Sequence, residues 1–185
     1  LQPRLHITYQ QAVQRYAAFD VFSISDADLR SMVTEWVGES MQLTRDACLD
    51  LVMSYKVEPN LPKDCLVFIS DYPSSQAALA RVYPNHEGHD VASRFELYVN
   101  GLELANGYHE LSDATEQQKR FKAEEGKAIK SEVTEPSSVD NNFLQAIEAG
   151  LPDCSGVAIG LDRILMLKLN TPEISKVLSF DFDRA

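Results

Sequence analysis

The chain has 185 residues, of which 44% are hydrophobic and 24% charged, as in one ordinary globular domain or a large part of a bigger one. A net charge of −11 excludes a global basic field for nucleic acid, so a tRNA or DNA partner would need a local patch or another domain. No apolar run approaches the roughly 18 residues of a membrane span and no signal peptide opens the chain, so we expect no membrane partner. Three widely spaced cysteines argue against a disulfide framework or zinc site and favour a reducing compartment, with the cytoplasm as the expected location.

The first third of the chain predicts helices. Their expected ranges are Tyr9–Ala18, Asp26–Val37 and Arg45–Tyr55. Thr8 and Gln11 form a capping-box pattern before the first helix, and Ser25 is an N-cap candidate for the second. Trp36 is interpreted as a core anchor rather than a stacking platform, and Tyr55 is expected on the buried side of the third helix.

A buried strand and a polar loop follow. The run CLVFI, residues 65–69, is short, apolar and rich in β-forming residues, and Pro73 with the neighbouring serines ends it. His86 and His89 lie in the segment PNHEGHD. An HxxH pair can hold a metal, but this segment lacks the helix that would aim both rings, so we interpret it as a solvated loop.

Residues 94–111, RFELYVNGLELANGYHEL, predict a β-hairpin, because Asn-Gly between two strand-like runs is the strongest short-range hairpin signal. The regular register pairs Val99 with Leu102, Tyr98 with Glu103 and Glu96 with Ala105. Glu96 and Glu103 then share a face and repel each other unless a cation lies between them. Mg²⁺ held by these carboxylates and by phosphate oxygens would satisfy them; the alternative is an exposed acidic face on an edge hairpin.

Beyond the hairpin, Asp113 and Glu116 resemble a capping box that starts a helix reaching about Lys130, and this helix is polar enough to be exposed. Residues 132–142 have the composition of a loop. A short helix over residues 143–149 is expected to end at Gly150.

The segment CSGVAIGLDRILMLKL predicts a strand over residues 156–160 and a helix over residues 161–169. Arg163 falls in the first turn of this helix, where the helix dipole disfavours a cation. An arginine behind glycines therefore suggests an anion-binding role, with pairing to Asp162 as the alternative. Neither GxxxxGK[ST] nor GxGxxG occurs in the sequence.

This strand, its glycines, the helix and the early arginine together resemble motif 3 of the class II aminoacyl-tRNA synthetases. The hairpin with ELANGYHELSDATEQQKRF resembles the lysyl branch of that class, and VFISDYPSSQAALAR resembles the strand before the hairpin there. Within the branch, the chain is most similar to the paralogues that activate (R)-β-lysine with ATP and attach it to a lysine of elongation factor P instead of tRNA. Ala105 and Ala158, where lysyl-tRNA synthetases usually carry glycine, favour these paralogues.

The resemblance implies an α+β fold, with part of an antiparallel sheet flanked by helices. It assigns residues 1–185 to the C-terminal part of the catalytic domain, from after motif 2 through motif 3. Motifs 1 and 2 are not found in the sequence. The chain by itself is therefore expected to be an inactive fragment of a homodimeric enzyme.

The resemblance also implies ATP and Mg²⁺ as cofactors and a role for each site residue. Glu96 and Glu103 resemble the Mg²⁺-binding carboxylates that hold a bent ATP. Arg163 resembles the arginine that contacts the γ-phosphate, and Gly160 would form a further part of the ATP site. The catalytic pair would be Glu103 with Arg163. The implied substrate-binding residues are Ala105 beside the pocket, Asn106 for the substrate carboxylate, Tyr108 along the lysine chain, Glu110 for the ammonium, and Gly156 as the pocket floor.

Strict alternation along the second hairpin strand sends Glu103 to one face and Asn106, Tyr108 and Glu110 to the other. We therefore expect a β-bulge or twist within residues 105–107, with Gly107 absorbing it. Two alternatives stay open: a fragment of a lysine-tRNA ligase, and a non-catalytic binding module that retains half of the fold.

Overall fold

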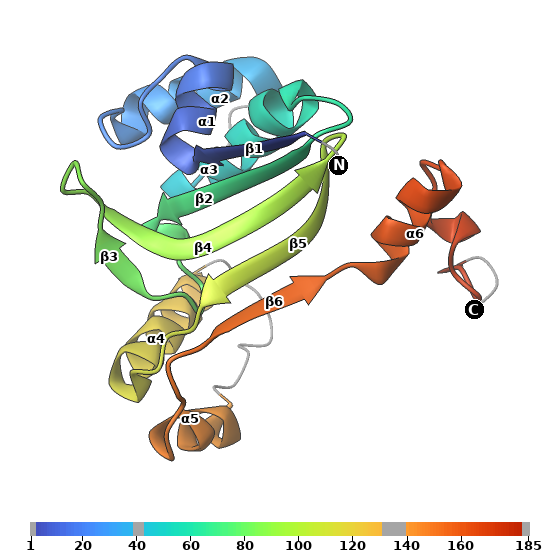
Figure 1. The fold of residues 1–185 in the computed structure, drawn as a ribbon. Helices are drawn as coiled ribbons and strands as arrows, with labels where there is room; N and C mark the ends of the chain where they lie inside the picture. The colour runs from blue at the N-terminus through green and yellow to red at the C-terminus, as the bar shows by residue number, and fades with distance from the viewer. Residues whose placement is uncertain (1–2, 39–42, 131–139, 183–185) are drawn as a thin grey trace.

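A six-stranded mixed sheet runs through the molecule, in the order β1-β2-β4-β5-β6 with the short β3 paired to β4 (Figure 1). The computed structural model describes residues 3–38, 43–130 and 140–182, and it describes 124–130 by their backbone alone. The strands are β1 Arg4–Thr8, β2 Leu66–Pro73, β3 Val82–Pro84, β4 Asp90–Val99, β5 Leu102–His109 and β6 Ser155–Ile159. The helices are α1 Tyr9–Ala17, α2 Asp26–Val37, α3 Arg45–Val52, α4 Ala114–Lys130, α5 Asn141–Glu148 and α6 Leu161–Leu169.

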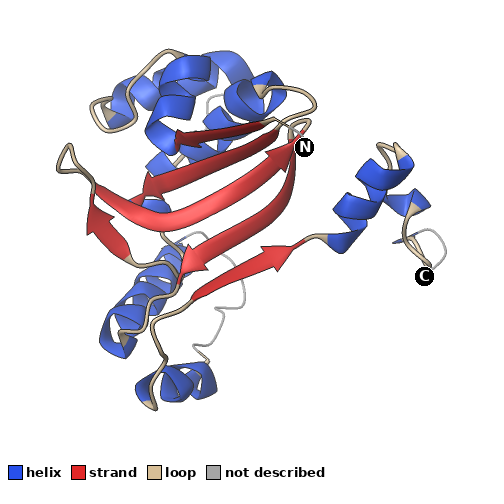
Figure 2. Ribbon diagram, in the orientation of Figure 1, coloured by secondary structure: helices blue, strands red, loops and turns tan. Residues whose placement is uncertain are grey.

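The predicted α+β fold is confirmed. Helices α1–α3 lie beside β1 and β2, and helices α4 and α5 lie near the end of β5 and the start of β6 (Figure 2). All strand pairs are antiparallel except β1 and β2, which run parallel. Strand β1 was not expected from the sequence. Among the described residues, no helix combines the length and apolar character needed to cross a bilayer.

The N-terminal helices begin where their caps predict. The Thr8 hydroxyl accepts from the Gln11 amide at 3.1 Å, and the Gln11 side chain accepts from the Thr8 amide at 3.0 Å, which completes the capping box. The Ser25 hydroxyl caps α2 by accepting from the Asp28 amide at 3.1 Å. The third helix is shorter than predicted, because after Val52 the chain widens into a π-helical turn over Met53–Val57. This turn leaves Tyr55 53% exposed, so the prediction that it is buried was wrong.

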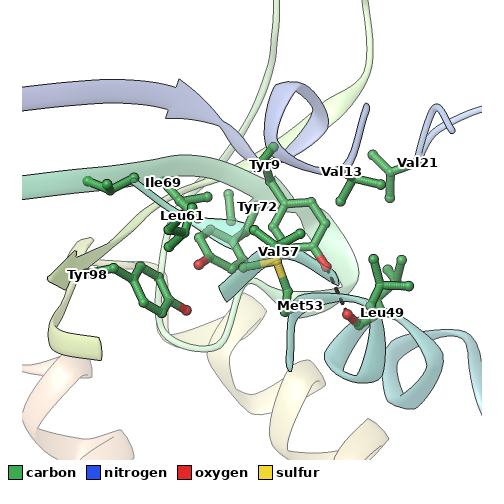
Figure 3. Close-up of a cluster of buried hydrophobic side chains, with 14 of the residues drawn as sticks. Tyr9, Val13, Val21, Leu49, Met53, Val57, Leu61, Ile69, Tyr72 and Tyr98 are labelled. Atoms are coloured by element: carbon green, nitrogen blue, oxygen red, sulfur yellow. Dashed lines mark hydrogen bonds between the residues drawn. The ribbon is translucent and has the colours of Figure 1, made fainter. Parts of the chain in front are cut away.

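The main core lies between α1–α3 and one face of the sheet. Figure 3 shows it as a cluster of side chains from α1, α3, the π turn, β2 and β4, among them Tyr9, Leu49, Ile69, Tyr72 and Tyr98. Full burial of one such aliphatic or aromatic side chain stabilises the fold by about 1.5–3 kcal/mol. Trp36 is only partly buried, yet it packs against this core as predicted. The Lys56 ammonium lies over the Trp36 ring, 4.4 Å from its centroid.

The hairpin turn is confirmed, but its register differs from the prediction in one place. Asn100 and Gly101 adopt φ of 55° and 79°, and Val99–Leu102 and Tyr98–Glu103 are paired as expected. The next pairs are Leu97–Ala105 and Glu96–Asn106, so Leu104 is an extra residue and the expected Glu96–Ala105 pair was wrong.

This bulge precedes the range predicted for it, and Gly107 does not absorb it. Gly107 is regularly paired with Phe95, and a Cβ atom there would collide with the Phe95 ring, which explains the glycine. The bulge shifts every later residue of β5 by one position. Asn106 and Tyr108 therefore lie on the same face as Glu96, whereas a regular ladder would place them on the other.

The C-terminal half contains the expected helices with two corrections. The Asp113 carboxylate caps α4 by accepting from the Thr115 and Glu116 amides. Gln117 is only 1% exposed, so this polar helix is not exposed all round, and that part of the prediction was wrong. Helix α5 begins at Asn141, two residues before its predicted start. The loop predicted over residues 132–142 lies mostly outside the described residues. Helix α6 continues from β6 and projects from the sheet (Figure 1).

Candidate active site

The predicted site residues gather on one face of three neighbouring strands. This site face bears Arg94, Glu96 and Tyr98 from β4, Glu103, Asn106 and Tyr108 from β5, and Gly156 and Ala158 from β6. Helices α1–α3 cover the same face of the sheet over β1 and β2, so one edge of the site borders the main core. The bulge at Leu104 is what brings Glu103 and Asn106 to a common face.

Glu96 is buried and already surrounded by donors. Its Oε2 accepts from the Tyr72 hydroxyl at 2.6 Å and from the Tyr98 hydroxyl at 2.5 Å. Its Oε1 accepts from Arg94 at 2.5 Å and lies 3.4 Å from the Asn106 amide nitrogen. Burial and this carboxylate together raise the pKa of Tyr72 and of Tyr98 well above the ordinary value, so both hydroxyls stay protonated donors. A metal ion at Glu96 would have to replace one of these donors.

Arg94 is a central residue of the site that our sequence analysis missed. Its three guanidinium nitrogens donate to three different residues: Glu96, Asn106 and the backbone carbonyl of Gln76. The sequence does indicate that Arg94 lies near Glu96, because it stands two residues earlier and alternation places both side chains on one face of a strand. Only its long-range partners show that it belongs to the site.

Glu103 and Arg163 form the second charged pair. The Arg163 Nη1 donates to the Glu103 backbone carbonyl at 2.7 Å and lies 3.6 Å from its carboxylate Oε2. Burial, followed by the negative charge of Glu96, raises the pKa of Glu103 above the ordinary value, and Arg163 and Arg94 oppose this shift. Glu58 behaves alike, since burial and then Glu96 and Glu103 raise its pKa. Negative charge is thus in excess at this end of the site.

The donor set fits a hard divalent cation beside Glu103. Among the described residues, no three His, Cys, Asp or Glu side chains gather closely enough to hold a metal by themselves. Mg²⁺ commonly uses one or two carboxylates and takes its other ligands from phosphate oxygens and water. Glu103 is half-exposed and its charge is only partly offset by Arg163, so it can supply such a ligand without losing a buried partner.

The opposite end of the site face is built around Glu110 and Gly156. A Cβ atom at position 156 would collide with the Glu110 carboxylate, so any larger residue would displace this acid from its place over β6. A cavity of about 380 Å³ opens beside these two residues and is otherwise mostly apolar. Its other lining residues are Leu79, Leu111, Gln117, Phe143, Ala146, Ile147, Leu151, Cys154 and Ser155.

A charged cluster fixes the backbone at Glu110. Arg81 Nε donates to the Glu110 carbonyl at 2.8 Å, and Arg81 Nη2 lies 2.8 Å from the Asp153 carboxylate. The His109 Nε2 lies 2.7 Å from the same carboxylate oxygen. The contact with His109 and the charge of Arg81 lower the pKa of Asp153. The His86–His89 loop is separate from this site, and His89 stacks on Phe22 with a centroid separation of 4.4 Å.

Two predicted residues lie apart from the site face. Ala105 pairs with Leu97, so alternation places it on the opposite face from Glu96 and Asn106. Ala158 pairs with Asn106 and is the alanine that lies on the site face. Gly160 is the N-cap of α6, where its amide donates to the Leu104 carbonyl at 2.9 Å and its Cα lies next to the Arg163 side chain.

Comparison with known proteins gives two findings. The chain matches the family described as tRNA synthetases class II (D, K and N) over residues 2–184. It is 45% identical to the elongation factor P–(R)-β-lysine ligase of Klebsiella pneumoniae subsp. pneumoniae and 43% identical to the protein of that name from Salmonella arizonae. Each match covers 100% of this chain and 57% of the relative, so the chain spans little more than half the length of these relatives.

Proposed function

Because the chain belongs to the class II tRNA synthetase family of the D, K and N type, we propose that it is part of an ATP-dependent ligase that activates (R)-β-lysine or lysine. The proposed acceptor is a lysine of elongation factor P, as the names of the two relatives indicate. Residues 1–185 would form the part of the catalytic domain from after motif 2 through motif 3, in an enzyme that acts as a homodimer. The observation that carries the proposal is the site face itself, with acids and arginines at one end and Glu110 at the other.

Strand β5 offers polar groups at the spacing that a lysine-type substrate needs. Asn106, Tyr108 and Glu110 follow each other at every second residue, and about 3.3 Å per residue places Asn106 and Glu110 roughly 13 Å apart along the strand. The Asn106 amide would donate to the substrate carboxylate, and Glu110 would pair with the distant ammonium. Tyr108 lies between them and would pack along the aliphatic chain.

The acidic end of the site face would bind ATP. Arg163 would contact the γ-phosphate and Gly160 would border the nucleotide. Glu103 would hold Mg²⁺, and Glu96 would join it where the ion replaces one of the hydrogen-bond donors on that carboxylate. When bound, Mg²⁺ neutralises phosphate charge and fixes the bend of the nucleotide. An oxygen of the substrate carboxylate attacks the α-phosphorus and forms the new P–O bond. The bond from this phosphorus to the bridging oxygen of the β-phosphate breaks, so pyrophosphate leaves and an acyl-adenylate remains. Positioning and charge stabilisation by these residues supply the catalysis.

A lysine-tRNA ligase is the second candidate, since the matched family includes the tRNA synthetases for lysine. The methyl group of Ala158 on the site face favours the elongation factor P ligase, because a pocket methyl changes substrate preference by about 1–3 kcal/mol. A non-catalytic module is the third candidate, and it predicts no transfer to any acceptor.

Transfer of labelled amino acid separates these candidates. The full-length protein would be incubated with ATP and labelled (R)-β-lysine or α-lysine, together with elongation factor P or lysine-accepting tRNA. The proposal predicts label on elongation factor P, with (R)-β-lysine preferred. Label on tRNA with α-lysine preferred would support the second candidate, and absence of label from both acceptors would support the third.

A further inference from the structure

Arg94 connects the residues that the proposed function places around the amino-acid substrate. Its Nη2 donates to Glu96 Oε1 at 2.5 Å, its Nη1 to the Gln76 carbonyl at 2.9 Å, and its Nε to Asn106 Oδ1 at 3.3 Å. Its guanidinium carbon lies 4.5 Å from the Tyr72 ring centroid and 5.8 Å from the Tyr108 ring centroid. The side chain is only 16% exposed, so these contacts define a single buried orientation.

This arrangement selects one of the two orientations of the Asn106 amide. A guanidinium group only donates hydrogen bonds, so the oxygen of Asn106 must face Arg94 and the NH2 group must face away from it. The NH2 nitrogen donates to Glu96 Oε1 at 3.4 Å, which uses one of its two N–H donors. The NH2 group is therefore left with donor capacity for another acceptor. A flipped amide would present its oxygen instead and would repel a carboxylate.

The guanidinium group is needed for this role, rather than positive charge alone. Three nitrogens in one plane reach a carboxylate on β4, an amide on β5 and a backbone carbonyl in the turn after β2. A lysine ammonium is a single point donor that lacks this fixed fork and stacks less well between rings. Replacement of Arg94 by lysine would keep the charge beside Glu96 and release Asn106.

We propose that Arg94 is a positioning residue for amino-acid binding: it holds the Asn106 amide with its NH2 group presented to the carboxylate of the amino-acid substrate. This inference rests on the proposed function, which assigns the substrate carboxylate to Asn106. In this role Arg94 acts through Asn106, and its effect is on amino-acid binding rather than on ATP binding.

The test uses amino-acid-dependent ATP–pyrophosphate exchange by the full-length protein, with Arg94→Lys, Asn106→Ala and the double variant. Arg94→Lys is expected to raise KM for the amino acid about tenfold, as for loss of one hydrogen bond to a charged group, and to leave KM for ATP nearly unchanged. Added to Asn106→Ala, the same change is expected to raise KM less than about twofold further, because both act on one contact. Arg45→Lys is the matched control, since Arg45 binds Asp26 and two backbone carbonyls outside the site.

Two results would overturn the positioning role: equal rises of both KM values in Arg94→Lys, or effects that multiply fully in the double variant. Asn106→Asp gives an independent test if Arg94→Lys fails to fold. It keeps an oxygen for Arg94 but removes the NH2 group, so KM for the amino acid should rise at least as much as in Asn106→Ala; an unchanged KM would contradict the role. Absence of exchange by the wild-type protein would instead contradict the proposed function, and the positioning role with it.

Discussion

Replacement of Glu96 by glutamine should destabilise the protein strongly, because it breaks a buried charged network. The wild-type carboxylate accepts from two tyrosine hydroxyls at 2.6 and 2.5 Å and from Arg94 at 2.5 Å. Glutamine has one acceptor and one donor end, so either the hydroxyls or Arg94 would face an NH2 group. Hydrogen bonds to a charged group contribute about 1.5–3 kcal/mol each, and loss of one partner of a buried ion pair costs about 3–5 kcal/mol. We expect a loss of about 3–5 kcal/mol in the free energy of unfolding.

Urea unfolding of the full-length protein followed by circular dichroism would measure this loss. Glu116→Gln is the matched control, since Glu116 pairs with Arg120 at 3.2 Å but is 42% exposed, and such pairs contribute at most about 1 kcal/mol. A loss below about 1 kcal/mol for Glu96→Gln would refute the pairing of this carboxylate with its donors.

Three further predictions follow from the site face. Gly156→Ala should push the Glu110 carboxylate away from the new methyl group. This displacement should raise KM for the amino acid in exchange assays and leave KM for ATP unchanged. An unchanged KM for the amino acid would contradict the placement of Glu110. Glu103→Gln should raise the melting temperature at pH 7–8, because burial and Glu96 raise the pKa of this carboxyl and its ionisation therefore costs stability as pH rises through that pKa. This gain should vanish below about pH 4, near the ordinary pKa of glutamate, and a lower melting temperature at pH 8 would contradict it. Gly107→Ala should cost about 1–3 kcal/mol in urea unfolding, because its methyl group meets the Phe95 ring, and a neutral substitution would refute the register beyond the bulge.

Local signals in the sequence were sufficient for the hairpin turn and the helix starts. Asn100 and Gly101 both adopt positive φ, which few other residue pairs tolerate, so the turn is encoded by two neighbours. The helix caps are likewise local, because Thr8 and Ser25 each bind the amide of a residue three positions later. These features were predicted because their physical cause lies within one turn of chain.

The features that the sequence analysis missed depend on contacts between distant segments. The bulge residue Leu104 is held by its carbonyl, which accepts from the Gly160 amide 56 positions later, and no local pattern marks it. Strand β1 is stabilised by parallel pairing with β2, more than 50 residues away. Gln117 is buried by the surrounding fold, although its helix has a mostly polar sequence. Most acids and polar groups of the site face were therefore named from the sequence, but Arg94 and the register that brings these residues together were not.

The most direct test of the site is ATP–pyrophosphate exchange by the full-length protein, with and without the substitution Glu103→Ala. We expect the wild-type protein to catalyse exchange that depends on (R)-β-lysine or lysine. In the variant we expect a loss of about 100-fold or more, as for removal of one preorganised electrostatic group, with an unchanged circular dichroism spectrum. Exchange by Glu103→Ala within about twofold of wild type would contradict the assignment of Glu103 to the ATP and Mg²⁺ site.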